Sequence, residues 1–541
     1  MKKFLRKYIF ATDHKIIGLQ FLFTALIFMF FGGLLAMAIR WQLAWPGEKL
    51  PILGIMMPET YDVIFTMHGT FMIFFVVIAI LVGAFGNFLI PLMVGTHDMA
   101  FPKINMASYW LFFISCVIMV GSFFAPGGAA ATGWTAYAPV SVIASKGQTW
   151  WLVSLIFLGT SSILGSFNYL TTIINLRAPG MGFFRMPMSV WGLFITAILS
   201  LLATPVLTSA LAMLLLDRLL GTTFFLGGVG QPVLWQHVFW FYSHPAVYIM
   251  ILPAMGMASD ILSVFSRKPL FGYHAMVYAL SAIAGLGFIV WAHHMFATGI
   301  NPTLGTTFMV STMLIAVPTG VKIFNWLGTL FGGRIRLTTP MLMAIAFVSM
   351  FVIGGLSGIF LAATAVDIFL HDTYFVVAHI HYVLFGGSMF GIFAGLYFWY
   401  PKMFGRMMNE KLGKIHFWFT FVFYNFTFFP MHLLGIHGMP RRIYDYRQYG
   451  FLQGLEPLQI FISISAFALF LGQIPFVYNF FVSLFRGKKA GNNPWQANTL
   501  EWTISSPAPH LNYEVIPKVY HGPYEYSVPG KKEDWTPQNQ P

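Results

Sequence analysis

Apolar stretches of about twenty residues or more recur along the whole chain, and they constrain its fold more than any other feature. A helix needs about 20 mostly apolar residues to cross roughly 30 Å of hydrocarbon. Twelve stretches meet this length, and we predict a membrane-spanning helix in each of them: 16–40, 62–93, 107–125, 148–176, 187–216, 233–263, 274–299, 305–329, 339–365, 370–400, 413–434 and 458–485.

The composition excludes most other classes of protein. Only 9% of the 541 residues are charged and 57% are apolar, whereas about 25% are charged in a soluble domain. A soluble enzyme, a nucleic-acid binder, a disordered scaffold and a disulfide-stapled secreted protein are therefore set aside. Cys116 is the single cysteine, which excludes an intrachain disulfide and any all-cysteine zinc or iron–sulfur site. The predicted fold class is all-α integral membrane.

The basic residues predict an orientation. If the spans alternate, most Lys and Arg residues fall on the side of the N-terminus, and few lie in the opposite loops. The positive-inside rule then puts both termini in the cytoplasm, and the net charge of +13 needs no nucleic-acid partner. We expect a cytoplasmic segment at 1–15 without a cleavable signal, a transmembrane catalytic domain at 16–486 and a polar tail at 487–541 over the cytoplasmic face.

Ionisable residues inside spans are functional candidates, because burying a charge in a bilayer costs several kcal/mol. No glutamate occurs between Glu59 and Glu410, and Lys322 is the one cation well inside a span. Lys322 either snorkels to an interface or serves a proton route.

Histidine gives the strongest signal. A lone buried histidine is more often a packing residue than a ligand, but seven fall within apolar spans, and each needs its own partner: His68, His237, His244, His293, His294, His379 and His381. Imidazole suits copper, iron and zinc, and metal coordination satisfies it without a charge cost.

The spacing of these histidines suggests two kinds of metal site. His379 and His381 project about 200° apart on a helix, so one helix could supply a ligand to each of two sites. His68 could meet one of them across a planar macrocycle. Two axial imidazoles make a closed haem, and a single one leaves an open face for a small ligand.

A third site would take three imidazoles. His293 and His294, about 100° apart on a helix, would join His244 around a copper with an open position for a diatomic gas. Tyr248 lies one turn from His244 on the same helix face. Its phenol is a plausible donor of a proton and an electron.

These residues resemble subunit I of the haem–copper terminal oxidases, in the cytochrome c oxidase branch, from about Asp13 to Pro509. The resemblance rests on specific stretches in order: TMHGT at 66–70, GNFLIPLMVG at 86–95, SHPAVY at 243–248, WAHHMF at 291–296, PTGVKIFNW at 318–326, HDTYFVVAHIHYV at 371–383 and GMPRR at 438–442.

The resemblance implies ligands for three redox groups. His68 and His381 match the axial ligands of a low-spin haem a, and His379 matches the ligand of a high-spin haem a3. His244, His293 and His294 match the copper ligands. Tyr248 matches the tyrosine that in the family is joined covalently to the copper-ligating histidine.

Further family positions surround these groups. Arg40 matches the residue that hydrogen-bonds the haem a formyl group. Trp134, Arg441 and Arg442 match residues near the haem propionates. His371 and Asp372 match a magnesium site at the boundary with subunit II.

The implied reaction is reduction of dioxygen to water by electrons from cytochrome c or a cytochrome c domain, coupled to proton translocation. Electrons would enter through a dicopper centre on a separate subunit II, since the one cysteine of this chain cannot form it. Subunit III, other oxidase subunits and membrane lipid are the further expected partners, and the bacterial inner membrane is the expected location.

Two proton routes follow from the resemblance. Lys322, Thr319, Ser259 and Tyr248 match the lysine-lined route. The residues that match the aspartate-entered route are Asp98, Asn87, Asn105, Asn168, Ser161 and Ser162.

The inner end of the second route departs from the commonest pattern. Many relatives carry a glutamate two residues after the copper-ligating histidine, where this chain has Ala246. Tyr242 and Ser243 stand just before His244, so the chain resembles the subgroup that uses a Tyr-Ser pair as the proton relay. A phenol holds its proton more tightly than a carboxyl, so hydrogen-bond hopping is expected at Tyr242.

Three alternatives remain. A proton-coupled transporter would also have many spans and few charges, but it would show no haem bands. A quinol-oxidising enzyme of the same superfamily differs mainly in its second subunit. A nitric oxide reductase would leave Tyr248 and both proton routes without a purpose.

Overall fold

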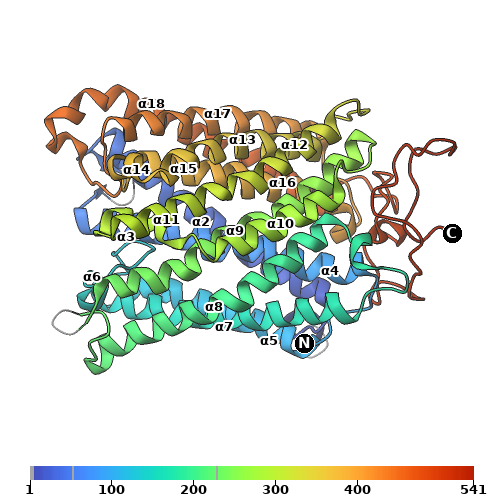
Figure 1. Ribbon diagram of the computed structural model, residues 1–541, viewed down its shortest axis with the longest axis horizontal. Helices are drawn as coiled ribbons and strands as arrows, with labels where there is room; N and C mark the ends of the chain where they lie inside the picture. Colours follow the sequence, from blue (N-terminus) through green and yellow to red (C-terminus); the bar gives the residue numbers. More distant parts are fainter. Residues whose placement is uncertain (1–4, 52–53, 227–229) are drawn as a thin grey trace.

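The computed structural model describes residues 5–51, 54–226 and 230–541 and is built almost wholly of helices. Within these ranges, twelve helical segments are long and apolar enough to cross a membrane. They lie side by side along the long axis of the molecule (Figure 1). The predicted all-α membrane fold is therefore confirmed.

Six spans are single α-helices, and one more is an α-helix with a short 3₁₀ extension. The six are α2 (His14–Ala44), α7 (Lys146–Asn175), α8 (Met188–Leu220), α9 (Pro232–Ser266), α13 (Thr339–Ala362) and α17 (Glu410–Ile436). The seventh is α5 (Pro102–Gly121), which continues into Ser122–Phe124.

The other five spans join two or more elements. They are α3 (Pro58–Thr70) with π-helical Phe71–Val77 and Ala79–Gly86 and then α4 (Asn87–Val94); α10 (Tyr273–Gly287) with 3₁₀ Trp291–Thr298; α11 (Pro302–Leu314) with α12 (Ala316–Leu330); α15 (Tyr374–Val383) with π-helical Leu384–Met389 and α16 (Phe390–Phe404); and 3₁₀ Gly450–Leu455 with α18 (Glu456–Leu471) and α19 (Ile474–Arg486).

Short elements connect the spans. They are the antiparallel pair β1 (Lys49–Leu50) and β2 (Gly54–Ile55), α6 (Val140–Ile143), α14 (Thr364–Leu370), the π turn Leu5–Ile9 and the 3₁₀ turns Phe183–Arg185, Tyr446–Gln448 and Leu500–Thr503.

The ends of several spans differ from the prediction by a few residues. The second span begins at Pro58 and not at 62, and the last begins at Gly450 and not at 458. Hydropathy detects the part of a helix that matches the hydrocarbon, whereas the helix itself continues into the polar interface. Proline suits the first turn of a helix because that turn needs no N–H donor, so Pro58 starts α3.

Two spans form the centre of the bundle. In the most apolar window of Pro58–Val94 and of Pro232–Ser266, 89% of residues are buried inside the protein, compared with 17% for Pro302–Leu330. The central spans carry His68 and His244. Outer spans expose large apolar side chains such as Phe324 and Leu202, as expected for contact with lipid.

The polar tail covers one end of the bundle (Figure 1). Arg267, whose side chain is 0% exposed, forms a 2.6 Å ion pair with Asp534. The Tyr524 hydroxyl donates to the buried carboxylate of Asp260. Asn512 contacts His14, so the tail and the start of the first span lie at the same end.

Candidate metal centres and proton routes

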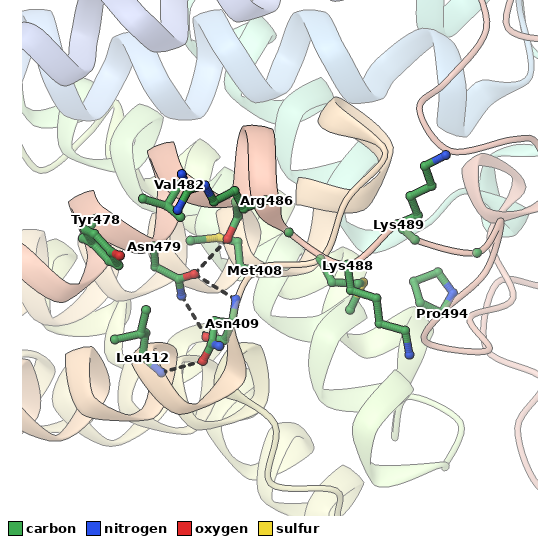
Figure 2. A pocket seen from close by; sticks show the side chains of 15 residues that line it. Met408, Asn409, Leu412, Tyr478, Asn479, Val482, Arg486, Lys488, Lys489 and Pro494 are labelled. Atoms are coloured by element: carbon green, nitrogen blue, oxygen red, sulfur yellow. Dashed lines mark hydrogen bonds between the residues drawn. The ribbon is translucent and has the colours of Figure 1, made fainter.

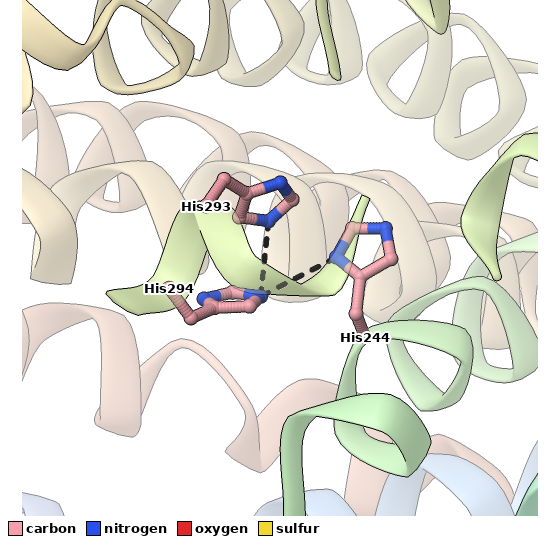
Figure 3. Close-up of side chains that lie close together, drawn as sticks. All are labelled: His244, His293 and His294. Atoms are coloured by element: carbon pink, nitrogen blue, oxygen red, sulfur yellow. Dashed lines mark hydrogen bonds between the residues drawn. The ribbon is translucent and has the colours of Figure 1, made fainter. Parts of the chain in front are cut away.

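Three histidine side chains converge between two spans (Figure 3). His244 comes from the middle of α9, and His293 and His294 come from the 3₁₀ segment that follows α10. His294 Nε2 lies 3.0 Å from His293 Nε2 and 3.3 Å from His244 Nδ1. One nitrogen from each ring lies within 4.8 Å of the others. Nitrogens bound to one ion at about 2.0 Å are spaced in this way, so the donor set fits a metal.

Neighbouring side chains fix the orientation of these rings. His293 Nδ1 lies 3.0 Å from the Thr312 hydroxyl, which leaves Nε2 for a metal. The Trp240 ring stacks on His294 with centroids 3.8 Å apart and planes inclined by 12°. Partners of this kind hold a ligand ring in place and tune its basicity.

Tyr248 lies beside this cluster. Its ring centroid is 4.7 Å from that of His244, one turn earlier on α9. The Nε2 atom of His244 is buried and has no hydrogen-bond partner among the described residues. A Cβ atom at Gly287 would lie 2.8 Å from the Tyr248 ring, so glycine leaves space for the phenol.

A second pair of histidines faces across the bundle. The rings of His68 in α3 and His381 in α15 are nearly parallel at 6°, with centroids 6.3 Å apart. His68 Nδ1 donates to the Gly32 carbonyl at 2.9 Å, and His381 Nδ1 donates to the Val377 carbonyl at 2.7 Å. Nε2 of each ring therefore carries the lone pair. The gap accommodates one ion with two bonds of about 2 Å, which fits a bis-imidazole haem.

His379 projects from the other side of the same helix. Its Nδ1 lies 3.0 Å from the Gly354 carbonyl and 3.0 Å from the Ser357 hydroxyl, both in α13. A Cβ atom at Gly358 would lie 3.0 Å from His379 Cε1. Nδ1 therefore anchors His379. Its ring lies on the other side of the helix from the His68–His381 pair, as the spacing predicts.

Arg40 belongs to α2, is 5% exposed, and its side chain contacts α18. Its guanidinium donates to Gln459 Oε1 at 2.8 Å and to the Ser463 hydroxyl at 2.9 Å. Its Nη1 atom is buried without a partner among the described residues. This donor fits a polar substituent of a neighbouring haem.

A polar corner gathers the predicted propionate and magnesium residues. Arg441 forms a close ion pair with Asp372, and His371 Nε2 lies 3.9 Å from the Asp372 carboxylate. Arg442 donates to the Thr135 hydroxyl at 3.2 Å. Arg442 also lies against Gly133, next to Trp134, so that a Cβ atom on Gly133 would be 2.8 Å from the guanidinium.

Asp372 and His371 lie in this corner, outside the spans, and their ion pairs shift their pKa values. The pKa of Asp372 is lowered, although burial raises it, because Arg441 and His371 hold opposite charge nearby. The pKa of His371 is raised because hydrogen bonding to Asp367 and the charge of Asp372 outweigh the effect of burial.

The residues of the predicted lysine route lie on two adjacent spans. Lys322 is 0% exposed, so its ammonium does not snorkel to an interface. Its Nζ lies 4.9 Å from the Trp326 ring, and the Trp326 indole donates to the Ser259 hydroxyl at 2.8 Å. The Thr319 hydroxyl donates to the Ile315 carbonyl in its own helix.

Three residues predicted for the aspartate route, Ser161, Ser162 and Asn168, lie in α7, which packs against α5 with Asn105. Asn168 accepts from the Phe101 amide at 2.9 Å. Asn105 is fully buried, and neither amide atom has a partner among the described residues. Ser161 and Ser162 line a cavity of about 40 Å³, which is enough for at least one water molecule.

Asp98 and the Tyr-Ser pair are the predicted ends of this route. Asp98 is in a loop outside the spans, and burial raises its pKa to about 6. Tyr242 is 3% exposed and Ser243 is 1% exposed. The Ser243 hydroxyl has no partner among the described residues.

Several residues that contact these sites were not predicted from the sequence. The candidate ligands His294, His293 and His379 contact Trp240, Thr312 and Ser357 in that order. These partners lie far from the ligands in the sequence and carry no distinctive motif, so the sequence gives no signal for them. Asn512 was missed because its partners lie near the opposite end of the chain.

A separate groove of about 680 Å³ lies where α19 ends (Figure 2). Its lining includes Met408, Asn479, Arg486 and Lys488, and none of the candidate ligand histidines. The groove is therefore distinct from the metal centres.

Comparison with known proteins agrees with this arrangement. The family described as "Cytochrome C and Quinol oxidase polypeptide I" matches residues 16–504. The chain is 50% identical to a cytochrome c oxidase subunit 1 from Synechocystis sp., covering 97% of this chain and 94% of the relative. It is 48% identical to one from Thermostichus vulcanus, with 97% and 93% covered.

Two further similarities are informative. An alternative cytochrome c oxidase subunit 1 from Bradyrhizobium diazoefficiens is 43% identical, with 99% of this chain and 93% of the relative covered. The solved structure of a heme-copper terminal oxidase dimer has a TM-score of 0.75 over 88% of this chain and 85% of its own, at 19% identity. At that identity, the likeness concerns the fold alone.

Proposed function

Since the chain belongs to the cytochrome c and quinol oxidase polypeptide I family and is thus the catalytic subunit of a haem–copper terminal oxidase, we propose that it reduces dioxygen to water with electrons from cytochrome c and pumps protons. The overall reaction takes four electrons and four protons per dioxygen and releases two water molecules. The convergence of His244, His293 and His294 carries the proposal, because three converging imidazoles without counter-charges suit a metal better than any structural role.

The ligand assignments follow the donor sets. His68 and His381 hold a low-spin haem a, His379 holds a high-spin haem a3, and the three-histidine cluster holds copper. When bound, these groups supply electron transfer and the site of dioxygen reduction. The unpaired Arg40 Nη1 supports the formyl-bearing haem a type, because it is a buried donor in need of an acceptor.

The remaining roles belong to side chains of this protein. The Tyr248 hydroxyl donates a proton at the copper site, and the unpaired His244 Nε2 beside its ring supports a covalent link between the two. Arg441, Arg442 and Trp134 orient the haem propionates through charge and hydrogen bonding. His371 and Asp372 bind magnesium at the boundary with subunit II.

Protons reach the site along two routes. Lys322, Thr319 and Ser259 deliver them toward Tyr248, which lies on the same helix as Ser259. Asp98 takes protons from the aqueous side, and Asn87, Asn105, Asn168, Ser161 and Ser162 pass them inward. Tyr242 and Ser243 relay them in place of the glutamate that Ala246 replaces.

As subunit I of a multi-subunit oxidase, the chain works with other subunits. Those proposed are subunit II with a dicopper centre, which Cys116 alone cannot form, and subunit III. The proposed location is the bacterial inner membrane with residues 1–15 and 487–541 in the cytoplasm, as the excess of basic residues on that side supports.

One measurement tests the metal assignments. A reduced-minus-oxidised optical spectrum with added carbon monoxide, combined with iron and copper analysis, should show two haem a groups, one of them open to carbon monoxide, and at least one copper. A colourless preparation would overturn the proposal. Oxidation of cytochrome c, compared with oxidation of a quinol by the same preparation, identifies the donor, and quinol oxidation alone would refute the cytochrome c assignment.

A further inference from the structure

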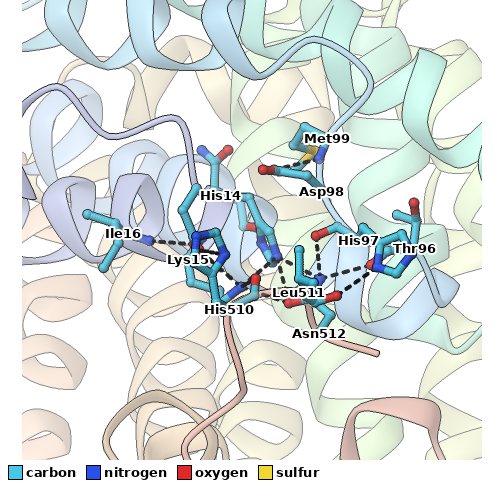
Figure 4. Close-up of polar contacts among 12 residues, drawn as sticks. His14, Lys15, Ile16, Thr96, His97, Asp98, Met99, His510, Leu511 and Asn512 are labelled. Carbon is cyan, nitrogen blue, oxygen red and sulfur yellow. Dashed lines mark hydrogen bonds and ion pairs between the residues drawn. The ribbon is translucent and has the colours of Figure 1, made fainter. Parts of the chain in front are cut away.

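The C-terminal tail sends one buried side chain into a polar cluster beside Asp98 (Figure 4). Asn512 is 1% exposed and adopts a positive φ of 62°, a conformation that asparagine and glycine tolerate better than other residues. Its Nδ2 donates to the Thr96 carbonyl at 2.8 Å and to the His97 carbonyl at 3.0 Å. These two carbonyls immediately precede Asp98 in the loop 95–99, which we name the entrance loop.

The same amide also contacts the start of the first span. His14 Nδ1 lies 2.8 Å from the Asn87 carbonyl, and a carbonyl can only accept, so Nδ1 donates and Nε2 of the neutral ring accepts. Asn512 Nδ2 lies 2.9 Å from that Nε2, so its two N–H groups are shared among this nitrogen and the Thr96 and His97 carbonyls. A buried chain of hydrogen bonds therefore runs from Asn512 through His14 to the backbone of Asn87.

Asn512 also fixes a cation near the entrance. Its Oδ1 accepts from Lys15 Nζ at 2.8 Å, and the same ammonium donates to the His510 carbonyl at 2.9 Å. Lys15 forms an ion pair with Asp13 at 3.4 Å. Among the charges that act on Asp98, Asp13 raises its pKa and Lys15 lowers it, while burial is the largest effect and raises it.

A purely structural role in tail packing is the simpler alternative, and Asn498 shows what such a role looks like. Asn498 is another buried asparagine of the tail, at 0% exposure. Neither of its amide atoms has a partner among the described residues. Asn512, in contrast, uses both amide atoms on groups that surround Asp98 and Asn87.

We propose that Asn512 is a positioning residue that holds the entrance loop, Lys15 and His14 in the arrangement through which the aspartate-entered route takes up protons. Asn512 is not itself a proton carrier, because an amide does not ionise. This inference rests on the proposed function, since it requires that Asp98 takes up protons.

Two substitutions separate the contacts. Asn512→Gly tolerates the positive φ and removes every side-chain contact. Asn512→Asp keeps an oxygen for Lys15 but replaces the donor to the Thr96 and His97 carbonyls with an acceptor. Asn498→Ala is the matched control, because it removes a buried tail amide that makes no hydrogen bond in the described part of the chain.

The test uses the complete purified oxidase in liposomes, with proton uptake followed after mixing the reduced enzyme with dioxygen. We expect both Asn512 variants to slow proton uptake about tenfold, which corresponds to about 1.4 kcal/mol of barrier, with unchanged haem spectra. The control should take up protons at the wild-type rate. In Asn512→Gly, Lys15 loses its contact with Oδ1 and can turn away from Asp98 toward Asp13 and the His510 carbonyl, so the carboxyl of Asp98 loses a stabilising charge. The pH profile of uptake should then move to higher pH.

Each other outcome overturns the inference. Wild-type uptake in both Asn512 variants would show that the contacts do not matter. Equal slowing in Asn498→Ala, or slowing without any change in the pH profile, would assign Asn512 to tail packing. Asp98→Asn separates a failure of the proposed route from a failure of the inference about Asn512. If Asp98→Asn takes up protons normally, the proposed route itself fails. Slow uptake in Asp98→Asn with normal uptake in Asn512→Gly removes only the role of Asn512.

Discussion

Replacing Lys322 with methionine should stabilise the protein and at the same time impair turnover. Lys322 is 0% exposed, and its ammonium has no hydrogen-bond partner among the described residues. A buried unsatisfied polar group costs about 1–3 kcal/mol, and more if charged. The Trp326 ring at 4.9 Å offsets this by about 1 kcal/mol through a cation–π contact. Methionine has nearly the same length and no charge, so Lys322→Met should gain up to about 2 kcal/mol.

Lys402 provides a matched control, because it is equally buried but well paired. Its ammonium donates to the Asn492 carbonyl at 2.8 Å and to the Ile504 carbonyl at 2.6 Å. Lys402→Met should therefore lose at least about 3 kcal/mol, since charge-assisted hydrogen bonds contribute about 1.5–3 kcal/mol each.

The assay compares chemical unfolding of the purified complex, followed by haem absorbance, with steady-state oxygen consumption. Lys322→Met should unfold at a higher denaturant concentration than wild type and consume oxygen far more slowly, while Lys402→Met should unfold at a lower one. A Lys322→Met protein that is less stable than wild type would refute the energetic reasoning. One that consumes oxygen at the wild-type rate would refute the proton role.

Three other predictions concern single side chains. Gly358→Ala should reduce the haem content and the carbon monoxide difference spectrum, because the new Cβ would lie 3.0 Å from His379 Cε1. The control is Gly355→Ala in the same helix, whose Cβ meets nothing within 4 Å and which should match wild type. Equal haem content in the two variants would contradict this prediction. Burial raises the pKa of Glu501 from 4.5 to about 7, so the native state keeps a proton that the unfolded state releases, and stability falls as pH rises from about 4.5 to about 7. Thermal denaturation across this range should show that fall in wild type and a smaller one in Glu501→Gln, and identical curves would argue against it. Tyr242→Phe should slow proton delivery and lower the number of protons pumped per electron, and a variant with unchanged turnover and an unchanged ratio would remove Tyr242 from the relay.

Much of the architecture could be predicted because the bilayer imposes a length on each helix. The twelve apolar stretches correspond to the twelve spanning helices. Helix geometry predicted that His68 would meet either His379 or His381, and the family resemblance selected His381, which is the ring that His68 faces. The predicted grouping of His244 with His293 and His294 is also present. Their roles as ligands stay a proposal.

Other features could not be derived from local patterns. Two of the π-helical segments begin three residues after His68 and three after His381, and hydropathy does not distinguish π from α helix. His293 and His294 lie in a 3₁₀ segment because the helix is interrupted after Gly287, so the angle between them is not that of the assumed α-helix. The positive φ of Asn512 and its contacts depend on a tail whose polar sequence has no periodicity.

The contact between His14 and Asn512 joins residues 498 positions apart. A loop of that length closes only after nearly the whole polypeptide has been synthesised, and long-range contacts of this kind form late in folding. The twelve helices can therefore be inserted before the contacts between the tail and the residues around Asp98 have formed. On the role proposed for Asn512, the last tail contact would complete the proton entrance after the remainder of the bundle is in place.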